Sequence, residues 1–193
     1  MPAESETVIN ERPATARVFF ALWPPDALAD TLAEVAREAA EHLGGRPTRR
    51  DTIHLTLAFL GDVPVSELPK LYAAGERVRA SSFALKIDRC GYWQHNGVLW
   101  AGLGEGLDCL HDLYRQLRAA LDESGFRPDP QVRRYTPHLT LVRRVSLVSD
   151  ESMQATAQGF RSLDWLCTSY VLVRSDLSAS GPQYTTLREF SLA

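Results

Sequence analysis

One tetrapeptide, His-Leu-Thr-Leu, occurs twice in this chain, at residues 54–57 and 138–141. Apolar and polar residues alternate around both copies, which is typical of β-strands. Because successive strand side chains point to opposite faces, each copy would bury its two leucines and present an imidazole beside a hydroxyl. Two such strands facing each other would provide two acid–base groups and two hydroxyl donors, a combination suited to a phosphate.

The repeat also has a purely structural interpretation. A single histidine on a strand is more often a packing residue than a catalyst, and a duplicated structural strand would give the same pattern. Nothing in strand packing, however, requires a histidine at the same step twice. We therefore interpret His54, Thr56, His138 and Thr140 as one candidate site.

Positive charge is concentrated near both copies, although the net charge of the chain is −3. Segments 46–54 and 133–144 hold seven of the 21 Lys and Arg residues, namely Arg46, Arg49, Arg50, Arg133, Arg134, Arg143 and Arg144. This clustering favours an anionic substrate, while the alternative is a solvated basic surface.

Length and composition are those of an ordinary globular protein, with 193 residues, 45% hydrophobic and 23% charged. No apolar run approaches the ~20 residues that cross a bilayer. Residues 1–16 are acidic and lack an apolar segment, so we expect a disordered leader rather than a secretory signal. The three scattered cysteines, Cys90, Cys109 and Cys167, argue against a disulfide framework and favour the cytoplasm.

The elements that must position the site follow from the hydrophobic pattern. Strands are expected at 17–23, 52–60, 83–93, 98–103, 164–172 and 184–192 and around the second motif, and helices at about 28–43, 68–78, 107–121 and 150–158. Asn96-Gly97 favours a tight hairpin between two of these strands. The hairpins indicate an α+β fold with a mixed or antiparallel sheet. We expect one bilobed domain over 17–193, built from two halves at about 17–90 and 91–193.

The reaction is narrowed by motifs that the chain lacks. It has no phosphate-binding glycine loop, no zinc-protease helix motif and no paired cysteines. Two histidines without further ligands make a poor metal site, because catalytic zinc needs three protein ligands. We therefore expect acid–base catalysis without metal or cofactor, with one imidazole neutral and the other protonated. The threonine hydroxyls would hold phosphate oxygens, and a 2′,3′-cyclic phosphate suits such a site because it is strained and its leaving oxygen needs a proton.

These residues resemble a known family. Two H-x-[ST]-x motifs on strands of a bilobed α+β domain mark the 2H phosphoesterase superfamily. Within it, the chain resembles the RNA 2′,3′-cyclic phosphodiesterases, also called 2′-5′ RNA ligase-like proteins. The resemblance runs from Arg17 and includes RVFFALWPP, HLTLAFLG, GYWQHNGVLW and PHLTLVRR. It implies a pseudo-symmetric fold with two mostly antiparallel sheets lining a central cleft and helices outside. It also implies hydrolysis of cyclic phosphate ends of RNA to 2′-phosphomonoesters, in RNA processing. We further expect a cytoplasmic monomer that binds no membrane.

The resemblance also assigns roles to residues. It implies that His54 is the proton donor, that His138 is the proton acceptor, and that Thr56 and Thr140 bind the phosphate. The family's arginine, five residues after the second histidine, is Arg143 here. Strict strand alternation would turn Arg143 away from the motif face, so a twist or bulge is needed, and Arg144 is the geometric alternative.

Other residues and functions stay open at this point. Tyr135 is a candidate for base stacking, and so are Trp23 and Trp93, although both tryptophans fit packing roles better. His42, His95 and His111 are expected at the surface. The alternatives in function are a 2′-5′ RNA ligase or phosphodiesterase, a phosphodiesterase for small cyclic nucleotides, and an RNA- or nucleotide-binding module without turnover.

Overall fold

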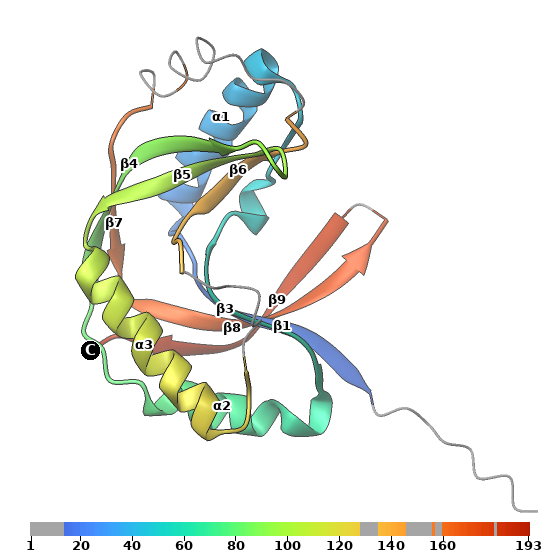
Figure 1. Ribbon diagram of the computed structural model, residues 1–193, viewed down its shortest axis with the longest axis vertical. Coiled ribbons are helices and arrows are strands. Elements are labelled where there is room, and N and C mark those ends of the chain that lie inside the picture. The colour runs from blue at the N-terminus through green and yellow to red at the C-terminus, as the bar shows by residue number, and fades with distance from the viewer. Residues whose placement is uncertain (1–13, 128–134, 146–155, 157–159, 180) are drawn as a thin grey trace, which may run out of the picture.

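The computed structural model describes residues 14–127, 135–145, 156, 160–179 and 181–193. In the described part the strands are β1 (Thr15–Leu22), β2 (Arg46–Pro47), β3 (Leu55–Pro64), β4 (Phe83–Trp93), β5 (Val98–Glu105), β6 (Leu139–Arg143), β7 (Leu163–Cys167), β8 (Ser169–Ser178) and β9 (Gly181–Ser191). The α-helices are α1 (Asp26–Leu43), α2 (Leu68–Arg77) and α3 (Leu107–Glu123), as Figure 1 shows. The predicted helix at 150–158 lies outside the described residues, apart from Thr156.

All nine strands belong to one antiparallel sheet, which confirms the α+β class. The order is β7-β4-β5-β6-β3-β1-β8-β9, with β2 paired to β6. The two predicted sheets are two halves of this sheet, and only the pair Leu55–Leu139 joins them in the ladder between β3 and β6. In Figure 1 the β4–β5–β6 half lies above the β1–β8–β9 half. The two motif strands therefore meet at the junction.

The strand order does not follow the predicted chain halves 17–90 and 91–193. β8 pairs with β1, and β9 with β8, so the C-terminal strands lie in the same half of the sheet as the N-terminal strand. The predicted single strand at 164–172 is in fact two strands, β7 and β8, which lie in opposite halves. Only Thr168 separates the two strands, so the sequence pattern did not reveal the break.

Element boundaries in the first third of the chain also differ from the predictions. β1 begins at Thr15 rather than at Arg17, and residues 1–13 of the expected leader lie outside the described part. β3 begins at Leu55 rather than at residue 52, because residues 50–52 form a 3-10 turn. β3 also continues past Gly61 to Pro64. Gly61 adopts φ +71° at an irregularity in the β1–β3 register, which permits the strand to continue.

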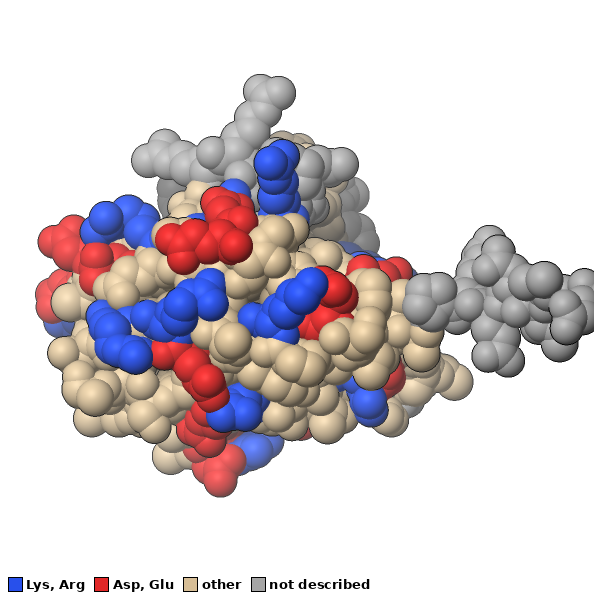
Figure 2. Space-filling model, turned by 90° about the horizontal axis from the view of Figure 1, so that it is seen from below, with Lys and Arg blue, Asp and Glu red and all other residues tan. Residues whose placement is uncertain are grey.

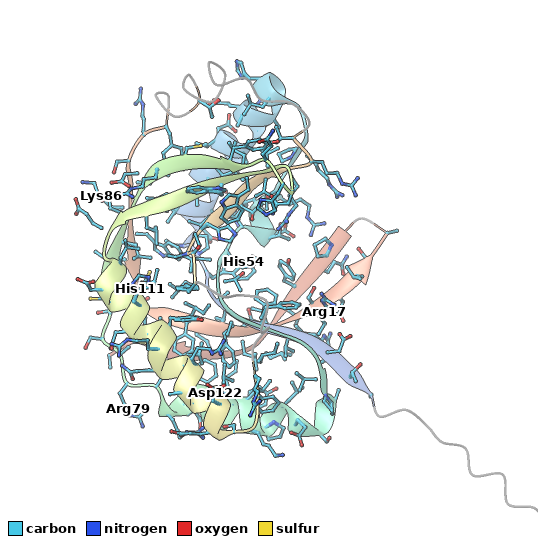
Figure 3. The ribbon with its side chains drawn as sticks, viewed as in Figure 1. Arg17, His54, Arg79, Lys86, His111 and Asp122 are labelled. Atoms are coloured by element: carbon cyan, nitrogen blue, oxygen red, sulfur yellow. The ribbon has the colours of Figure 1, made fainter. Side chains whose placement is uncertain are left out.

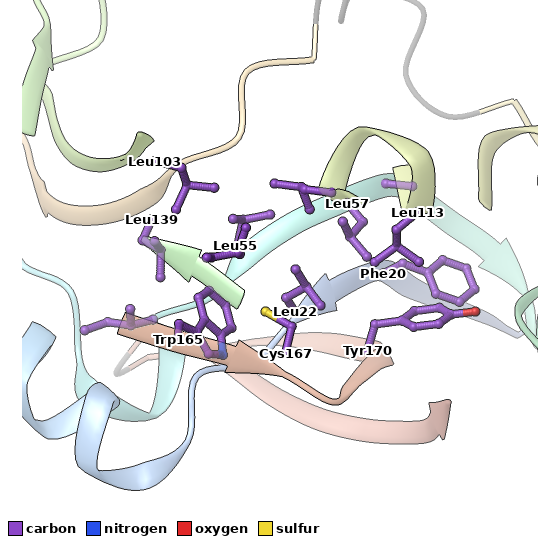
Figure 4. Packing of buried hydrophobic residues seen from close by; sticks show 14 of the residues in the cluster. Phe20, Leu22, Leu55, Leu57, Leu103, Leu113, Leu139, Trp165, Cys167 and Tyr170 are labelled. Carbon is purple, nitrogen blue, oxygen red and sulfur yellow. The ribbon is translucent and has the colours of Figure 1, made fainter. Parts of the chain in front are cut away.

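The core lies where the motif leucines are. Leu55, Leu57, Leu139 and Leu141 are at most 2% exposed and belong to one apolar cluster, part of which Figure 4 shows. The prediction that each motif buries its leucines is thus confirmed. Full burial of a leucine contributes about 1.5–3 kcal/mol, so the strand positions of both motifs are fixed by the core.

The helices pack against the sheet and against each other. α1 packs against β6, and α2 packs against α3. α1 begins at Asp26, directly after Pro25, and its last residue is Leu43, as predicted. On the face in Figure 2, Lys and Arg side chains are interspersed with Asp and Glu. No helix in the described part of the chain is long and apolar enough to span a membrane.

Candidate active site

Each motif histidine is held through the same ring nitrogen. His54 Nδ1 lies 2.8 Å from the carbonyl oxygen of Thr52, and His138 Nδ1 lies 2.8 Å from that of Thr136. A carbonyl oxygen can only accept, so Nδ1 carries the hydrogen in both rings. The other nitrogen, Nε2, is therefore the one that takes up or releases a proton. His54 Nε2 lies 3.1 Å from the Thr56 hydroxyl.

Both motif strands carry a β-bulge at the second leucine. In the β1–β3 register, Phe20 and Ala21 face Ala58 and Thr56, which leaves Leu57 as the extra residue. The corresponding irregularity in β6 leaves Leu141 without a partner in β5. A bulge changes which face the following side chains use, and bulges are frequent beside active sites.

The bulge at Leu141 explains the position of Arg143. Simple alternation would place this side chain on the face opposite Thr140, yet Arg143 lines the same cavity as Thr140. The predicted need for a twist or bulge is therefore confirmed. Arg144 adopts φ 59°, an unusual conformation for a residue other than glycine, and does not line the cavity.

The structure brings the two motifs together at one cavity of about 140 Å³. Figure 3 shows His54 near the centre of the molecule, between the two halves of the sheet. The cavity is lined by Thr48, Thr52, His54, Thr56, Trp93, Asn96, Val98, His138, Thr140 and Arg143. It thus combines two imidazoles, several hydroxyls and one guanidinium.

Aromatic side chains surround the imidazoles. Trp23 stacks on His54 with ring centres 5.3 Å apart and planes 8° apart. Phe19 and Tyr184 also contact His54, at 4.9 and 5.4 Å. Trp93 meets His138 at 4.5 Å with its ring nearly perpendicular. Trp23 and Trp93 therefore pack against the rings of the two candidate catalytic histidines.

This burial alters the acidity of both rings. The pKa of His54 is lowered to about 4, mainly by burial and in part by the charges of Arg143 and His138, against the bond to Thr52. The pKa of His138 is also lowered, mainly by burial and in part by Arg143, against the bond to Thr136. Both rings therefore release a proton more readily than a histidine in water. A bound phosphate anion would offset the charge of Arg143 and raise both pKa values.

Two arginines of the predicted cluster, Arg49 and Arg50, make contacts within the protein. Arg50 pairs with Asp26 at 2.8 Å and with Asp30. Arg49 contacts Asp51 at 3.2 Å and donates to a backbone carbonyl of β9 at 2.8 Å. Arg133 and Arg134 lie outside the described residues. Of the clustered arginines that the structure describes, Arg143 alone lines the cavity.

Tyr135 lies outside this cavity. Its ring stacks on Tyr114 with centres 4.0 Å apart and planes 3° apart, and its hydroxyl donates to the Thr56 carbonyl at 3.3 Å. One face of the Tyr135 ring is thus covered by Tyr114, and its hydroxyl is hydrogen-bonded to the first motif strand. His42, His95 and His111 are exposed, as predicted.

Sequence reasoning missed Thr48 and Asn96. Thr48 donates its backbone N–H to the Leu141 carbonyl at 2.7 Å, which places it beside the second motif. Its hydroxyl is buried and has no hydrogen-bond partner among the described residues. Asn96 signalled only a hairpin turn. Their positions depend on pairing with β6, which no local pattern indicates.

Candidate metal ligands do not gather at the cavity. Across the residues that the structure describes, no three His, Cys, Asp or Glu side chains lie close enough together to hold a metal ion. Cys90, Cys109 and Cys167 are all free thiols.

Comparison with known proteins finds relatives that match most of the chain. The LigT-like phosphoesterase family model matches residues 22–100, which include the first motif. The RNA 2′,3′-cyclic phosphodiesterase of Escherichia coli is 31% identical over 180 residues, which cover 91% of this chain and 96% of that protein. The Thermus thermophilus protein of the same name is 30% identical and covers 91% of this chain and 90% of its own length.

A solved structure extends the likeness to three dimensions. The crystal structure of E. coli LigT complexed with 3′-AMP matches with a TM-score of 0.79 and 27% identity. The match covers 93% of this chain and 99% of that one. The chain therefore belongs to the LigT-like phosphoesterase family.

Proposed function

We propose that the chain hydrolyses RNA 2′,3′-cyclic phosphate ends to 2′-phosphomonoesters without a metal ion. The observation that carries the proposal is the convergence of two Nδ1-anchored imidazoles on one cavity that also holds Thr56, Thr140 and Arg143. Relatives named RNA 2′,3′-cyclic phosphodiesterase, similar over nine-tenths of the chain, support the same reaction.

In the proposed mechanism, His138 Nε2 takes a proton from water as the water oxygen attacks phosphorus. The bond between phosphorus and the 3′ oxygen breaks, and protonated His54 gives its Nε2 proton to that oxygen. Thr56, Thr140 and Arg143 hold the non-bridging oxygens and stabilise the charge that develops on them. The two rings exchange protons with solvent to restore the starting states.

This role requires His54 to be protonated, although burial lowers its pKa to about 4. The negative charge of the bound phosphate supplies the compensation, since it favours the charged ring. A proton held by a group of low pKa is also readily transferred.

The first test measures turnover of an oligonucleotide that ends in a 2′,3′-cyclic phosphate. His54→Ala and His138→Ala are each expected to lower kcat by at least ~100-fold, as for loss of a general acid or base. His42→Ala removes an exposed histidine of α1 and is the matched control. Product analysis should show a 2′-phosphate, and a chelator should leave the rate unchanged. Wild-type turnover in either motif variant, or loss of activity with the chelator, would contradict the proposal.

The direction of proton transfer has its own test. A substrate with sulfur in place of the bridging 3′ oxygen has a leaving group that needs no proton. This substrate should restore most of the rate of His54→Ala but not that of His138→Ala. The reverse pattern would exchange the two roles. Assays with 2′-5′-linked dinucleotides and small cyclic nucleotides test the alternative substrates.

A further inference from the structure

A second hollow adjoins the active site and has no role in the mechanism above. Its volume is about 850 Å³, and its lining includes Arg89, Trp100, His111, Tyr114, Arg115 and Tyr135. It also includes Pro137, the residue before His138. Figure 3 labels His111 on α3, beside this region. We propose that this hollow binds the RNA strand on the 5′ side of the cyclic phosphate, with a nucleobase stacked on Trp100. The inference rests on the proposed function.

The size of the active-site cavity requires such an extension. At about 140 Å³ it is well below the roughly 300–1,000 Å³ of sites that bury a whole small-molecule ligand. It can hold the phosphate and little more. Because a cyclic phosphate ends the strand on its 3′ side, the rest of an RNA substrate must leave the cavity on the 5′ side.

The hollow lies on the same face of the sheet as the active site. In the strand register Trp100 is paired with Thr140 of β6 and with Gly91 of β4, so these positions share one face. Ring contacts link the two sites. Trp93 lies 4.5 Å from His138 and 5.5 Å from Trp100, measured between ring centres. A strand leaving the cavity past Trp93 therefore meets Trp100 next.

Trp100 is shaped as a platform because glycines lie beneath it. A Cβ on Gly91 would come within 2.2 Å of the indole, and one on Gly102 within 2.6 Å. The indole therefore lies flat against the strands, and it also lines the hollow. Its Nε1–H is buried and lacks a hydrogen-bond partner among the described residues. A flat aromatic face beside a strand path is the usual stacking surface for single-stranded nucleic acids.

Two cations stand at the rim. The side chains of Arg89 and Arg115 are 65% and 73% exposed, and their partners are Asp88 at 3.8 Å and Asp112 at 2.6 Å. Exposed ion pairs of this kind contribute little to stability. Both guanidiniums can therefore exchange these partners for backbone phosphates of the strand.

The test compares substrates of different length. Its readout is the ratio of kcat/KM for a tetranucleotide 2′,3′-cyclic phosphate to that for a nucleoside 2′,3′-cyclic phosphate. We expect the wild type to prefer the tetranucleotide by about tenfold or more, since stacking contributes roughly 1–3 kcal/mol per base. Trp100→Leu should lower this ratio about fivefold or more, through KM. Trp100→Phe, which keeps a ring, should restore part of it.

Three further variants separate binding from folding. Gly91→Ala keeps the indole but pushes it off the sheet, and should lower the ratio as Trp100→Leu does. Arg115→Ala should lower the ratio and weaken its dependence on salt. Lys70→Ala is the matched control, because Lys70 forms an exposed helical pair with Glu67 as Arg115 does with Asp112. It should leave the ratio unchanged.

Several outcomes would overturn the inference. A wild-type ratio near one would show that the strand makes no contact beyond the terminal nucleotide. An equal loss on both substrates in Trp100→Leu would place the terminal base, or only a structural role, at this position. If the wild type turned over neither substrate, the proposed function itself would fail, and the inference with it.

Discussion

Two hydrogen bonds to backbone carbonyls determine which ring nitrogen of each candidate catalytic histidine faces the cavity. The carbonyls of Thr52 and Thr136 fix the hydrogen on Nδ1 of His54 and His138. Each carbonyl lies two residues before its histidine, so both motifs use the same local contact. Burial of His54 lowers the stability of the folded protein at low pH, because it makes the charged form of the ring unfavourable.

The cost should be measurable as a pH dependence of stability. The pKa of His54 is about 4 when folded, below its ordinary 6.5, so the unfolded chain binds more protons between these values. The free energy of unfolding therefore rises with pH across this window and falls on acidification. The expected loss between pH 6.5 and pH 4 is about 3 kcal/mol from this residue.

Urea unfolding at several pH values checks this prediction. His54→Gln should show a shallower slope between pH 4 and 6.5 than the wild type, whereas His42→Gln should keep the wild-type slope. The remaining slope in His54→Gln would include His138, whose pKa is lowered too. An unchanged slope in His54→Gln would contradict the burial of an uncharged ring.

At the scale of elements, the position of Arg143 depends on its neighbour β2. Gly45, directly before β2, adopts φ +94°, and a Cβ there would lie 2.7 Å from the Arg143 carbonyl. Gly44 adopts φ +72°, but a Cβ there would meet nothing within 4 Å. Both glycines have a positive φ, and they differ in the space around them.

This difference yields a matched pair of variants. Gly44→Ala should cost about 1–3 kcal/mol of stability, from backbone strain alone, and leave kcat/KM unchanged, because Gly44 lies at φ 72° and ψ −172°, a conformation used almost only by glycine. Gly45→Ala should cost more and lower kcat/KM by about tenfold or more, because Arg143 must move and small displacements at a site are expensive. Denaturant unfolding and steady-state kinetics measure both. Equal activity in the two variants would show that β2 does not position Arg143.

The same element explains what sequence could and could not predict. The pairs His54–Thr56 and His138–Thr140 were predictable, because strand alternation is a local property. The bulge that turns Arg143 toward the cavity was predictable only from the resemblance, because the family's arginine falls on Arg143. Thr48 and Trp100 escaped because pairing with β6 brings them to their sites, and pairing between distant segments leaves no local pattern. The break between β7 and β8 escaped for the same reason.

At the scale of the whole molecule, the site exists only where the two halves of the sheet meet. β3 brings one imidazole and hydroxyl, β6 brings the other, and one residue pair joins these strands in the ladder. The arginines near the motifs offer less free positive charge for an anionic substrate than the sequence suggested, because Arg49 and Arg50 contact acidic side chains. The cytoplasmic location and the monomeric state stay predictions.

The proposed mechanism requires His54 and His138, from the two halves of the sheet, to act on one phosphorus atom in one step. The most direct measurement is kcat/KM of His54→Ala, His138→Ala and the double variant on an oligonucleotide with a 2′,3′-cyclic phosphate end. Each single change should cost at least ~100-fold, and the double variant should lose far less than the product of the two losses, since residues that act as a unit are not additive. A double-variant loss equal to that product would show that the two histidines act independently, and would contradict the account.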